Sequence, residues 1–130
     1  MQPIFHLVPS APNPIAPFSH AVESGGFLFL TGQMPSDAGQ GGRYPDGIEA
    51  QTRQVMRNLM QVLEGCGASL KDVVSSRVYL TYFVEDYDPM NAAYAGFFDA
   101  DTLPARTCVG VTHLARGARI EIDMVARKPA

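Results

Sequence analysis

Residues 48–66 carry a regular pattern of hydrophobic positions that is typical of an α-helix with one buried face. The members of this face recur at spacings of three and four; they are Ile48, Thr52, Val55, Leu59, Val62, Leu63 and Cys66. The polar residues between them, such as Gln51, Gln54 and Asn58, are expected mostly elsewhere on the helix. Gly65 and Gly67 end the pattern, because glycine favours helix C-termini. The pattern predicts an amphipathic helix of about five turns.

Shorter segments rich in β-branched and aromatic residues predict strands. These segments are residues 19–24, 27–31, 73–84, 105–111 and 119–127, with at most a short edge strand near 4–8. Gly25-Gly26 joins the first two of them and has the sequence of a two-residue hairpin turn. Five of the ten prolines fall within the first 17 residues, so this stretch should run extended.

A second helix is predicted for roughly residues 87–98, with Pro89 in its first turn, where a missing N–H costs no hydrogen bond. Residues 35–47 hold two prolines and four glycines and are expected to form a loop. The resulting order, β-β-β-α-β-α-β-β, predicts an α+β fold: a sheet of five or six strands with both helices packed on one face. The opposite face of that sheet lacks a cover in one copy of the chain, so we expect a homo-oligomer.

Length and composition restrict the class of protein. A chain of 130 residues with 46% hydrophobic residues is the size of a single domain, and we expect one domain over residues 1–130. The net charge of −3, with basic residues scattered along the chain, argues against a nucleic-acid binder. No apolar run approaches a membrane span and no signal peptide is recognisable. Cys66 and Cys108 are isolated, so we expect no disulfide and a cytoplasmic location.

Several common catalytic arrangements find no support in the spacing of residues. His6, His20 and His113 lie far apart and outside any metal-binding motif, so no metal is expected. The glycine-rich residues 39–42 follow no strand directly and precede no GK[ST] sequence, as a phosphate loop requires. Cys108 lies five residues from His113, but nothing in that spacing selects a nucleophilic cysteine over a buried core residue.

Arg106 is the residue with the clearest chemical implication. Strand alternation places Arg106 and Cys108 on one face of the segment 105–111. A half-buried guanidinium cannot lose its charge, so it needs a carboxylate or phosphate partner. Glu121 and Asp123 share one face of the last strand, and if the two strands pair, Glu121 lies near Arg106. Two interpretations follow: a structural ion pair or solvated sheet face, or a small anion pocket at a subunit interface with one cation and one acid.

At these residues the sequence resembles the Rid/YjgF family of reactive-intermediate (enamine/imine) deaminases. The resemblance covers about residues 14–127 and depends on the order of several segments, each weak alone. The segments are APFSHA (16–21), LTGQMP (30–35), AQTRQ (50–54), NAAYAGFF (91–98), PARTCV (104–109) and IEI (120–122).

The resemblance implies a chorismate-mutase-like α+β fold and a homotrimer with clefts between its subunits. It also implies hydrolysis, without a cofactor, of 2-aminoacrylate, 2-aminocrotonate and their imine tautomers, 2-iminopropionate and 2-iminobutyrate, to 2-keto acids and ammonia. By the same resemblance Arg106 grips the substrate carboxylate, and Glu121 positions the water or shuttles protons. The other implied substrate-binding positions are Phe18, Thr31, Gly32, Asn91 and Cys108.

Three departures from the family pattern bear on the substrate. Phe18 stands where archetypal members have tyrosine, Thr31 replaces a serine, and Gly110 replaces a frequent acidic residue. Alternatives are therefore a specialised deaminase of a catabolic enamine, of the 3-aminoacrylate or aminomuconate type, or a non-catalytic regulatory trimer that binds a carboxylate metabolite. The acidic net charge argues against a further alternative, an RNA-cleaving translation inhibitor.

Overall fold

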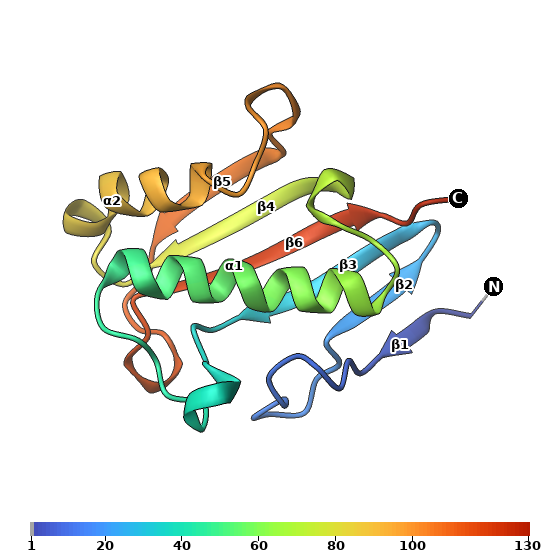
Figure 1. Cartoon of the computed structure of the whole chain (residues 1–130), viewed down its shortest axis with the longest axis horizontal. Helices are drawn as coiled ribbons and strands as arrows, with labels where there is room; N and C mark the ends of the chain where they lie inside the picture. Colours follow the sequence, from blue (N-terminus) through green and yellow to red (C-terminus); the bar gives the residue numbers. More distant parts are fainter. Residues whose placement is uncertain (1) are drawn as a thin grey trace.

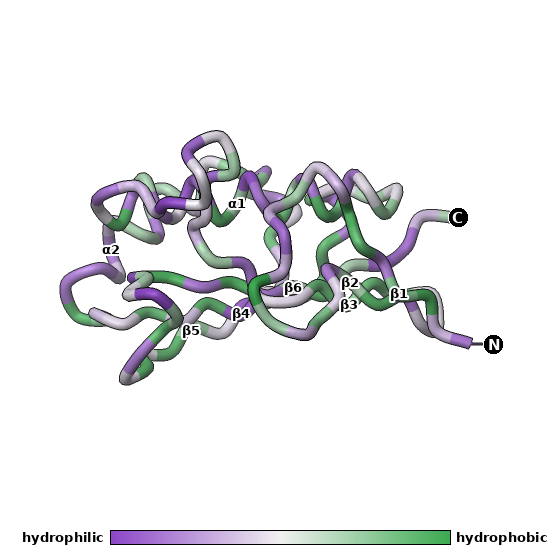
Figure 2. The backbone as a smooth tube through the Cα atoms, turned by 90° about the horizontal axis from the view of Figure 1, so that it is seen from below, coloured by the Kyte–Doolittle hydropathy of each residue, from purple (hydrophilic) through white to green (hydrophobic). Residues whose placement is uncertain are grey.

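The computed structural model describes residues 2–130 as one twisted sheet with two helices on it (Figure 1). The main elements are β1 (Ile4–His6), β2 (Ala21–Ser24), β3 (Phe27–Gln33), α1 (Ile48–Gly65), β4 (Val73–Leu80), α2 (Phe83–Ala95), β5 (Ala105–Gly110) and β6 (Ile120–Arg127). The strand order is β1-β2-β3-β6-β4-β5, antiparallel throughout except for the parallel pair of β4 and β5. Figure 2 shows the helices in one layer and the strands in the other. The predicted α+β architecture, with both helices on one face, is confirmed.

Helix α1 buries the face that its periodicity predicts: all seven of those positions are buried, packed over β3 and β6. Three of its polar residues are buried as well, contrary to expectation. Asn58 donates from Nδ2 to the carbonyls of Met34 (3.0 Å) and Ser36 (2.9 Å), and Gln54 donates to Asn58. Gln51 accepts from the backbone N–H of Arg119 (2.9 Å). These side chains satisfy loop backbone groups, which a hydrophobic pattern does not distinguish from contact with solvent.

The predicted boundaries of α2 are wrong. The helix begins one turn earlier than predicted and ends at Ala95, so Pro89 lies in its interior. The residues before it have strand propensity, but the carboxylate of Asp86 is buried and accepts two hydrogen bonds from Arg119, at 2.8 and 2.9 Å. This contact with Arg119, the residue before β6, holds the first turn of α2 against the sheet. Tertiary contacts of this kind override local propensity.

His20 fixes the proline-rich N-terminal segment, whose short edge strand β1 is as predicted. The imidazole is 2% exposed; its Nδ1 accepts from the backbone N–H of Val8 at 2.8 Å, and its Nε2 donates to the carbonyl of Pro12 at 2.7 Å. The Val8 contact requires the neutral tautomer protonated on Nε2. His20 is therefore a structural histidine that ties residues 8–12 to the sheet.

The sheet face away from the helices carries a row of apolar side chains. Cross-strand register aligns Phe5 with Val22, Val22 with Phe29, and Phe29 with Val125 across β1, β2, β3 and β6. Phe5 is 68% and Phe29 49% exposed. Exposed apolar side chains in contiguous rows are typical of surfaces that associate.

Candidate active site

Arg106 lies on the edge strand β5, on the face covered by α2. Its Nη1 donates to Oδ1 of Asn91 at 2.7 Å, and its Nη2 makes a longer contact with the hydroxyl of Tyr87 at 3.5 Å. The guanidinium carbon lies 5.9 Å from the ring centroid of Tyr87 and 5.1 Å from that of Tyr94, within range of cation–π attraction. Among residues 2–130 no carboxylate forms an ion pair with Arg106. Its half-buried charge therefore remains available to an anionic ligand.

Two buried hydroxyl groups, those of Ser76 and Tyr94, lie close to Arg106. Ser76 is the register neighbour of Arg106 on β4, and the hydroxyls of Ser76 and Tyr94 are buried without a well-aligned hydrogen-bond partner in the described residues. Burial raises the pKa of the Tyr94 phenol, while the nearby Ser76 hydroxyl and the Arg106 charge lower it. Arg106 thus lies over hydroxyl groups with spare hydrogen-bonding capacity.

Cys108 shares the face of Arg106 and is half-buried. Burial raises the pKa of its thiol, and the Arg106 charge opposes this only in part. A thiol with a raised pKa contains little thiolate, the nucleophilic form. The environment of Cys108 therefore does not favour a cysteine nucleophile.

Glu121 lies on β6 and projects from the opposite, uncovered face of the sheet. Its carboxyl group lies directly over Gly32 of β3: a Cβ at position 32 would overlap Oε2 and approach Cδ to 2.9 Å. Burial raises the pKa of the Glu121 carboxyl, and the negative charge of Asp123 raises it further. Within the described residues the Glu121 side chain has no ion-pair partner. Arg77, on the neighbouring strand β4, pairs with Asp123 instead, at 2.8 Å. A carboxyl with a raised pKa and no cation beside it is suited to exchange protons.

Arg106 and Glu121 do not meet within one chain. Strand β4 lies between β5 and β6, which separates the two residues by about two strand spacings, roughly 10 Å, across the sheet. Their partners on β4, Ser76 and Tyr79, are in addition three residues apart along the strand. Arg106 aligns with the buried Ser76, whereas Glu121 aligns with Tyr79 on the other face. Pairing of β5 with β6, the condition under which Glu121 would lie near Arg106, does not occur, and the two side chains form no ion pair within one chain.

The implied site residues thus form two clusters. Arg106, Asn91 and Cys108 lie on β5 and α2; Thr31, Gly32 and Glu121 lie on β3 and β6. Phe18 is 39% exposed and lies near the second cluster, since the N–H of Thr31 donates to the carbonyl of His20 (3.0 Å), two residues further along.

Sequence reasoning missed the two tyrosines around Arg106. Tyr87 and Tyr94 lie four residues before and three residues after Asn91 on the same helix, and such positions share a helix face. The spacing of the two tyrosines from Asn91 could therefore have identified them from the sequence.

The glycine at position 110, one of the three departures from the family pattern, is explained by packing. A Cβ there would lie 3.2 Å from Cβ of Phe83.

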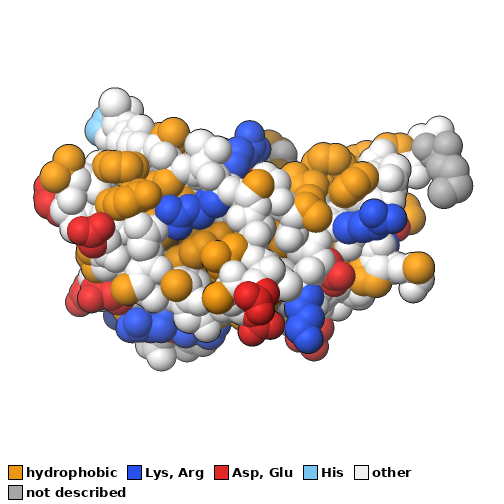
Figure 3. Space-filling model, turned by 90° about the horizontal axis from the view of Figure 1, so that it is seen from above, with side chains coloured by type: hydrophobic (Ala, Val, Ile, Leu, Met, Phe, Trp, Pro, Cys, Tyr) orange, Lys and Arg blue, Asp and Glu red, His pale blue; other side chains and the backbone are white. Residues whose placement is uncertain are grey.

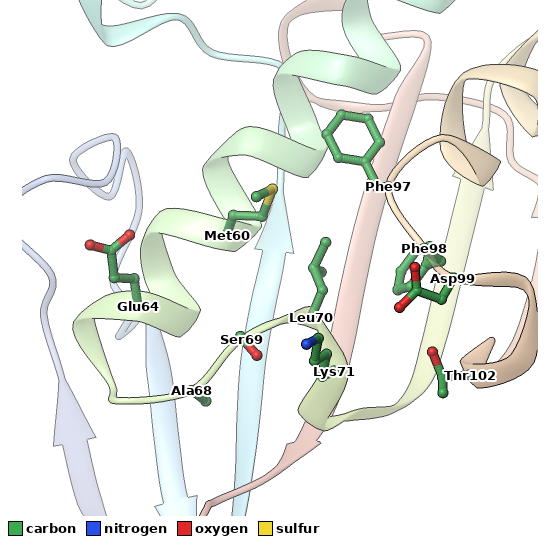
Figure 4. A pocket seen from close by; sticks show the side chains of 10 residues that line it. All are labelled: Met60, Glu64, Ala68, Ser69, Leu70, Lys71, Phe97, Phe98, Asp99 and Thr102. Atoms are coloured by element: carbon green, nitrogen blue, oxygen red, sulfur yellow. The ribbon is translucent and has the colours of Figure 1, made fainter.

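A separate hollow of about 410 Å³ lies on the helix side, between the C-terminal half of α1 and residues 97–102 (Figure 4). Met60, Leu70 and Phe97 point into it, with Glu64 and Lys71 also in its lining. None of the implied site residues lines it.

Other features limit the classes of site. Across residues 2–130 no group of three His, Cys, Asp or Glu side chains is arranged to hold a metal ion. In the same part of the chain neither helix combines the length and apolar composition needed to cross a membrane. On the face shown in Figure 3 the basic side chains stand among hydrophobic and acidic ones and form no continuous stripe.

Comparison with known proteins gives a consistent result. A family model described as Endoribonuclease L-PSP matches residues 8–128. A RutC family protein of Pyrococcus horikoshii is 42% identical over 119 residues, which cover 92% of this chain and 93% of that protein. A 2-iminobutanoate/2-iminopropanoate deaminase of Dermatophagoides farinae is 33% identical over 117 residues, 90% of each chain. The crystal structure of YyfA, from the conserved Rid protein family of Yersinia pestis, matches with a TM-score of 0.88 and 32% identity over 95% of this chain and 99% of that one.

Proposed function

The chain belongs to the endoribonuclease L-PSP family, which includes the Rid/YjgF proteins, and from this premise we propose that it hydrolyses reactive 2-imino and 2-enamino carboxylic acids to 2-keto acids and ammonia. The observation that carries the proposal is the Arg106 guanidinium: half-buried, oriented by Asn91 at 2.7 Å, and without a carboxylate partner in the described chain. The name of the D. farinae relative supports the same reaction.

Arg106 binds the substrate carboxylate. A planar guanidinium can hold a carboxylate through two parallel hydrogen bonds, each contributing on the order of 1.5–3 kcal/mol when charged. Asn91 and the ring of Tyr94 restrict the guanidinium to one orientation. An imino acid held in this way presents its C2 atom at a fixed place, and orientation is the main requirement for an electrophile that already reacts with water.

Glu121 transfers the protons in this reaction. Its carboxylate takes a proton from the attacking water as the water oxygen bonds to C2, and the carboxyl returns that proton to the nitrogen, which gives a neutral tetrahedral carbinolamine. The carboxylate then takes the proton of the carbinolamine hydroxyl and passes it to the nitrogen, so that the C2–N bond breaks, ammonia leaves and the C2–O bond becomes the keto group. Burial raises the pKa of Glu121, which suits a group that must both accept and donate a proton near neutral pH.

We place the reaction between copies of the chain. Arg106 and Glu121 project from opposite faces of the sheet in one copy, so a substrate touched by both takes Arg106 from one subunit and Glu121 from the next. The exposed apolar row that includes Phe5 and Phe29 gives such copies a surface on which to associate. A homotrimer with three equivalent sites satisfies this arrangement.

The test is a coupled assay. 2-Iminopropionate is generated from alanine by an amino-acid oxidase in the presence of semicarbazide, which traps free imine, and release of pyruvate is measured with and without the protein. Wild type should accelerate release. Arg106→Ala should abolish the acceleration with an unchanged sedimentation coefficient, and Arg106→Lys should recover only part of it because lysine lacks the planar fork. A folded oligomer that binds pyruvate but leaves the rate unchanged would instead identify a carboxylate-binding protein without this activity.

A further inference from the structure

Two loops meet at the end of the sheet that carries Glu121. Strands β3 and β6 are antiparallel, with Gln33 opposite Ile122, so the chain leaving β3 and the chain entering β6 lie at the same edge (Figure 1). The hydroxyl of Tyr44, from the first loop, donates to the carbonyl of Ala115, from the second, at 3.2 Å. The two loops are therefore joined just beyond the carboxyl group of Glu121.

A hollow of about 330 Å³ lies at this junction, lined by Gly41, Gly42, Arg43, Tyr44 and Arg116. Neither arginine forms an ion pair with a carboxylate of residues 2–130.

The polar surroundings leave both charges exposed to a ligand. Arg43 donates from Nη2 to Oε1 of Gln40 at 3.4 Å, a neutral partner. The acidic residues Asp37 and Asp46 line a neighbouring hollow that also includes Arg43, and neither lines the first hollow. The first hollow therefore has two exposed guanidinium groups in its lining, each permanently charged and able to bind a carboxylate.

The backbone of Arg116 adds an independent observation. Its φ of 56° and ψ of 30° put it in the left-handed region, which residues other than glycine adopt rarely. Strained conformations cluster at ligand-binding sites. Here the strain accompanies an arginine beside the hollow, at a position where glycine would fit the backbone better.

Tyr44 connects this hollow to the proposed catalytic carboxyl. Burial raises the pKa of its phenol; the positive charge of Arg116 lowers it, and the negative charge of Glu121 raises it. The Tyr44 side chain thus lies close enough to both residues to sense their charges.

We propose that Arg43 and Arg116 bind a second anionic group of the substrate, so that the preferred imines carry a carboxylate at the end of their side chain. This inference rests on the proposed function: Arg106 holds the carboxylate on C1, Glu121 acts at C2, and the arginine hollow receives the distal carboxylate. The substrate class is then the imines of dicarboxylic amino acids, such as 2-iminosuccinate and 2-iminoglutarate, and the products are the corresponding dicarboxylic keto acids.

The experiment compares two substrates and two products. The ratio of kcat/KM for 2-iminoglutarate to that for 2-iminopropionate is measured with both imines generated by oxidases, and the Kd values of 2-oxoglutarate and pyruvate are measured by calorimetry. We expect wild type to favour the dicarboxylic member of each pair by about tenfold, the effect of one additional charged hydrogen bond.

Two substitutions at one position test the cause. Arg116→Gln removes the charge, and Arg116→Gly removes both the charge and the backbone strain, so it is expected to remain folded. Both should reduce each ratio several-fold, because Arg43 alone then remains to bind the distal carboxylate, and both should leave 2-iminopropionate turnover intact. Arg53→Gln, an exposed arginine on α1, is the matched control and should change neither ratio.

An equal preference in wild type and the Arg116 variants would overturn this inference. Turnover of 2-iminopropionate without any dicarboxylate preference would refute only the second anion site, whereas absence of turnover with both imines would refute the proposed function itself.

Discussion

The contact between Glu121 and Gly32 leads to a sharp prediction for Gly32→Ala. The backbone of Gly32 is not in the left-handed region, so alanine fits it without strain. The added Cβ overlaps Oε2 of Glu121 and comes within 2.9 Å of Cδ and 3.1 Å of Cγ. The carboxyl group must therefore move by about 1 Å or more to restore normal contact, and a displacement of that size can cost about 100-fold in rate.

The same geometry predicts a small effect on stability. The overlapping atoms belong to the mobile end of a side chain rather than to backbone, so the free energy of unfolding should fall by less than about 1 kcal/mol. The assay is kcat/KM for 2-iminopropionate beside a urea denaturation curve. Gly96→Ala is the matched control, because its Cβ meets only the carbonyl of Ala93 at 3.6 Å, and it should keep full activity.

A double-mutant cycle tests whether the loss runs through Glu121. In a Glu121→Gln background, already slow, Gly32→Ala should add almost nothing, because both changes remove the same positioned carboxylate. Wild-type activity in Gly32→Ala would refute the reasoning. So would a loss that multiplies fully with that of Glu121→Gln.

Three further substitutions test the ion pair, the structural histidine and the acid. Asp86→Ala should lower the free energy of unfolding by about 2–3 kcal/mol, less than a fully buried pair would lose, because Arg119 keeps 32% of its side chain exposed; urea denaturation measures this. His20→Phe should cost about 2–4 kcal/mol in the same measurement, since it leaves a buried N–H and a carbonyl unpaired. Because the pKa of Glu121 is raised and the carboxylate is the base in the proposed reaction, kcat/KM should fall as pH drops through that pKa. Asp123→Asn removes a negative charge that raises this pKa, so it should move the acidic limb of the pH profile to lower pH.

The first two of these substitutions have matched controls. Glu85→Ala removes a more distant partner of Arg119, 4.0 Å away and 71% exposed, and should change the free energy of unfolding by less than about 0.5 kcal/mol. His113→Gln alters an exposed histidine and should leave stability unchanged. An acidic limb that stays at the same pH in Asp123→Asn would exclude Glu121 as the titrating base.

Local patterns predicted the elements whose burial is set by their own periodicity. The apolar face of α1 and the alternation of β6 are as expected, because each buries one side against a single core. The boundaries of α2 were missed because the contact of Asp86 with Arg119 joins residues 33 positions apart. Alternation assigned Arg106 and Cys108 to one face correctly, but it carries no information on which strands are neighbours.

For this reason the sequence left open whether Arg106 and Glu121 form an ion pair within one chain. The position of β4 between β5 and β6 depends on the whole topology, and the register of its two pairings, Ser76 with Arg106 and Tyr79 with Glu121, places the two residues on opposite faces. The orientation of Arg106 by Asn91 and the tyrosines likewise required the position of α2 over the sheet.

The opposite orientation of Arg106 and Glu121 has a genetic consequence. If each site takes one residue from each of two copies, a subunit lacking the arginine and a subunit lacking the glutamate are complementary. If the chain forms the proposed trimer, one of the three junctions in a mixed trimer always joins two intact halves, whatever the composition. Two alleles that are each inactive alone would then together restore about a quarter of normal activity at random assembly. Harmful recessive changes at the two positions could thus mask each other in a cell that expresses both.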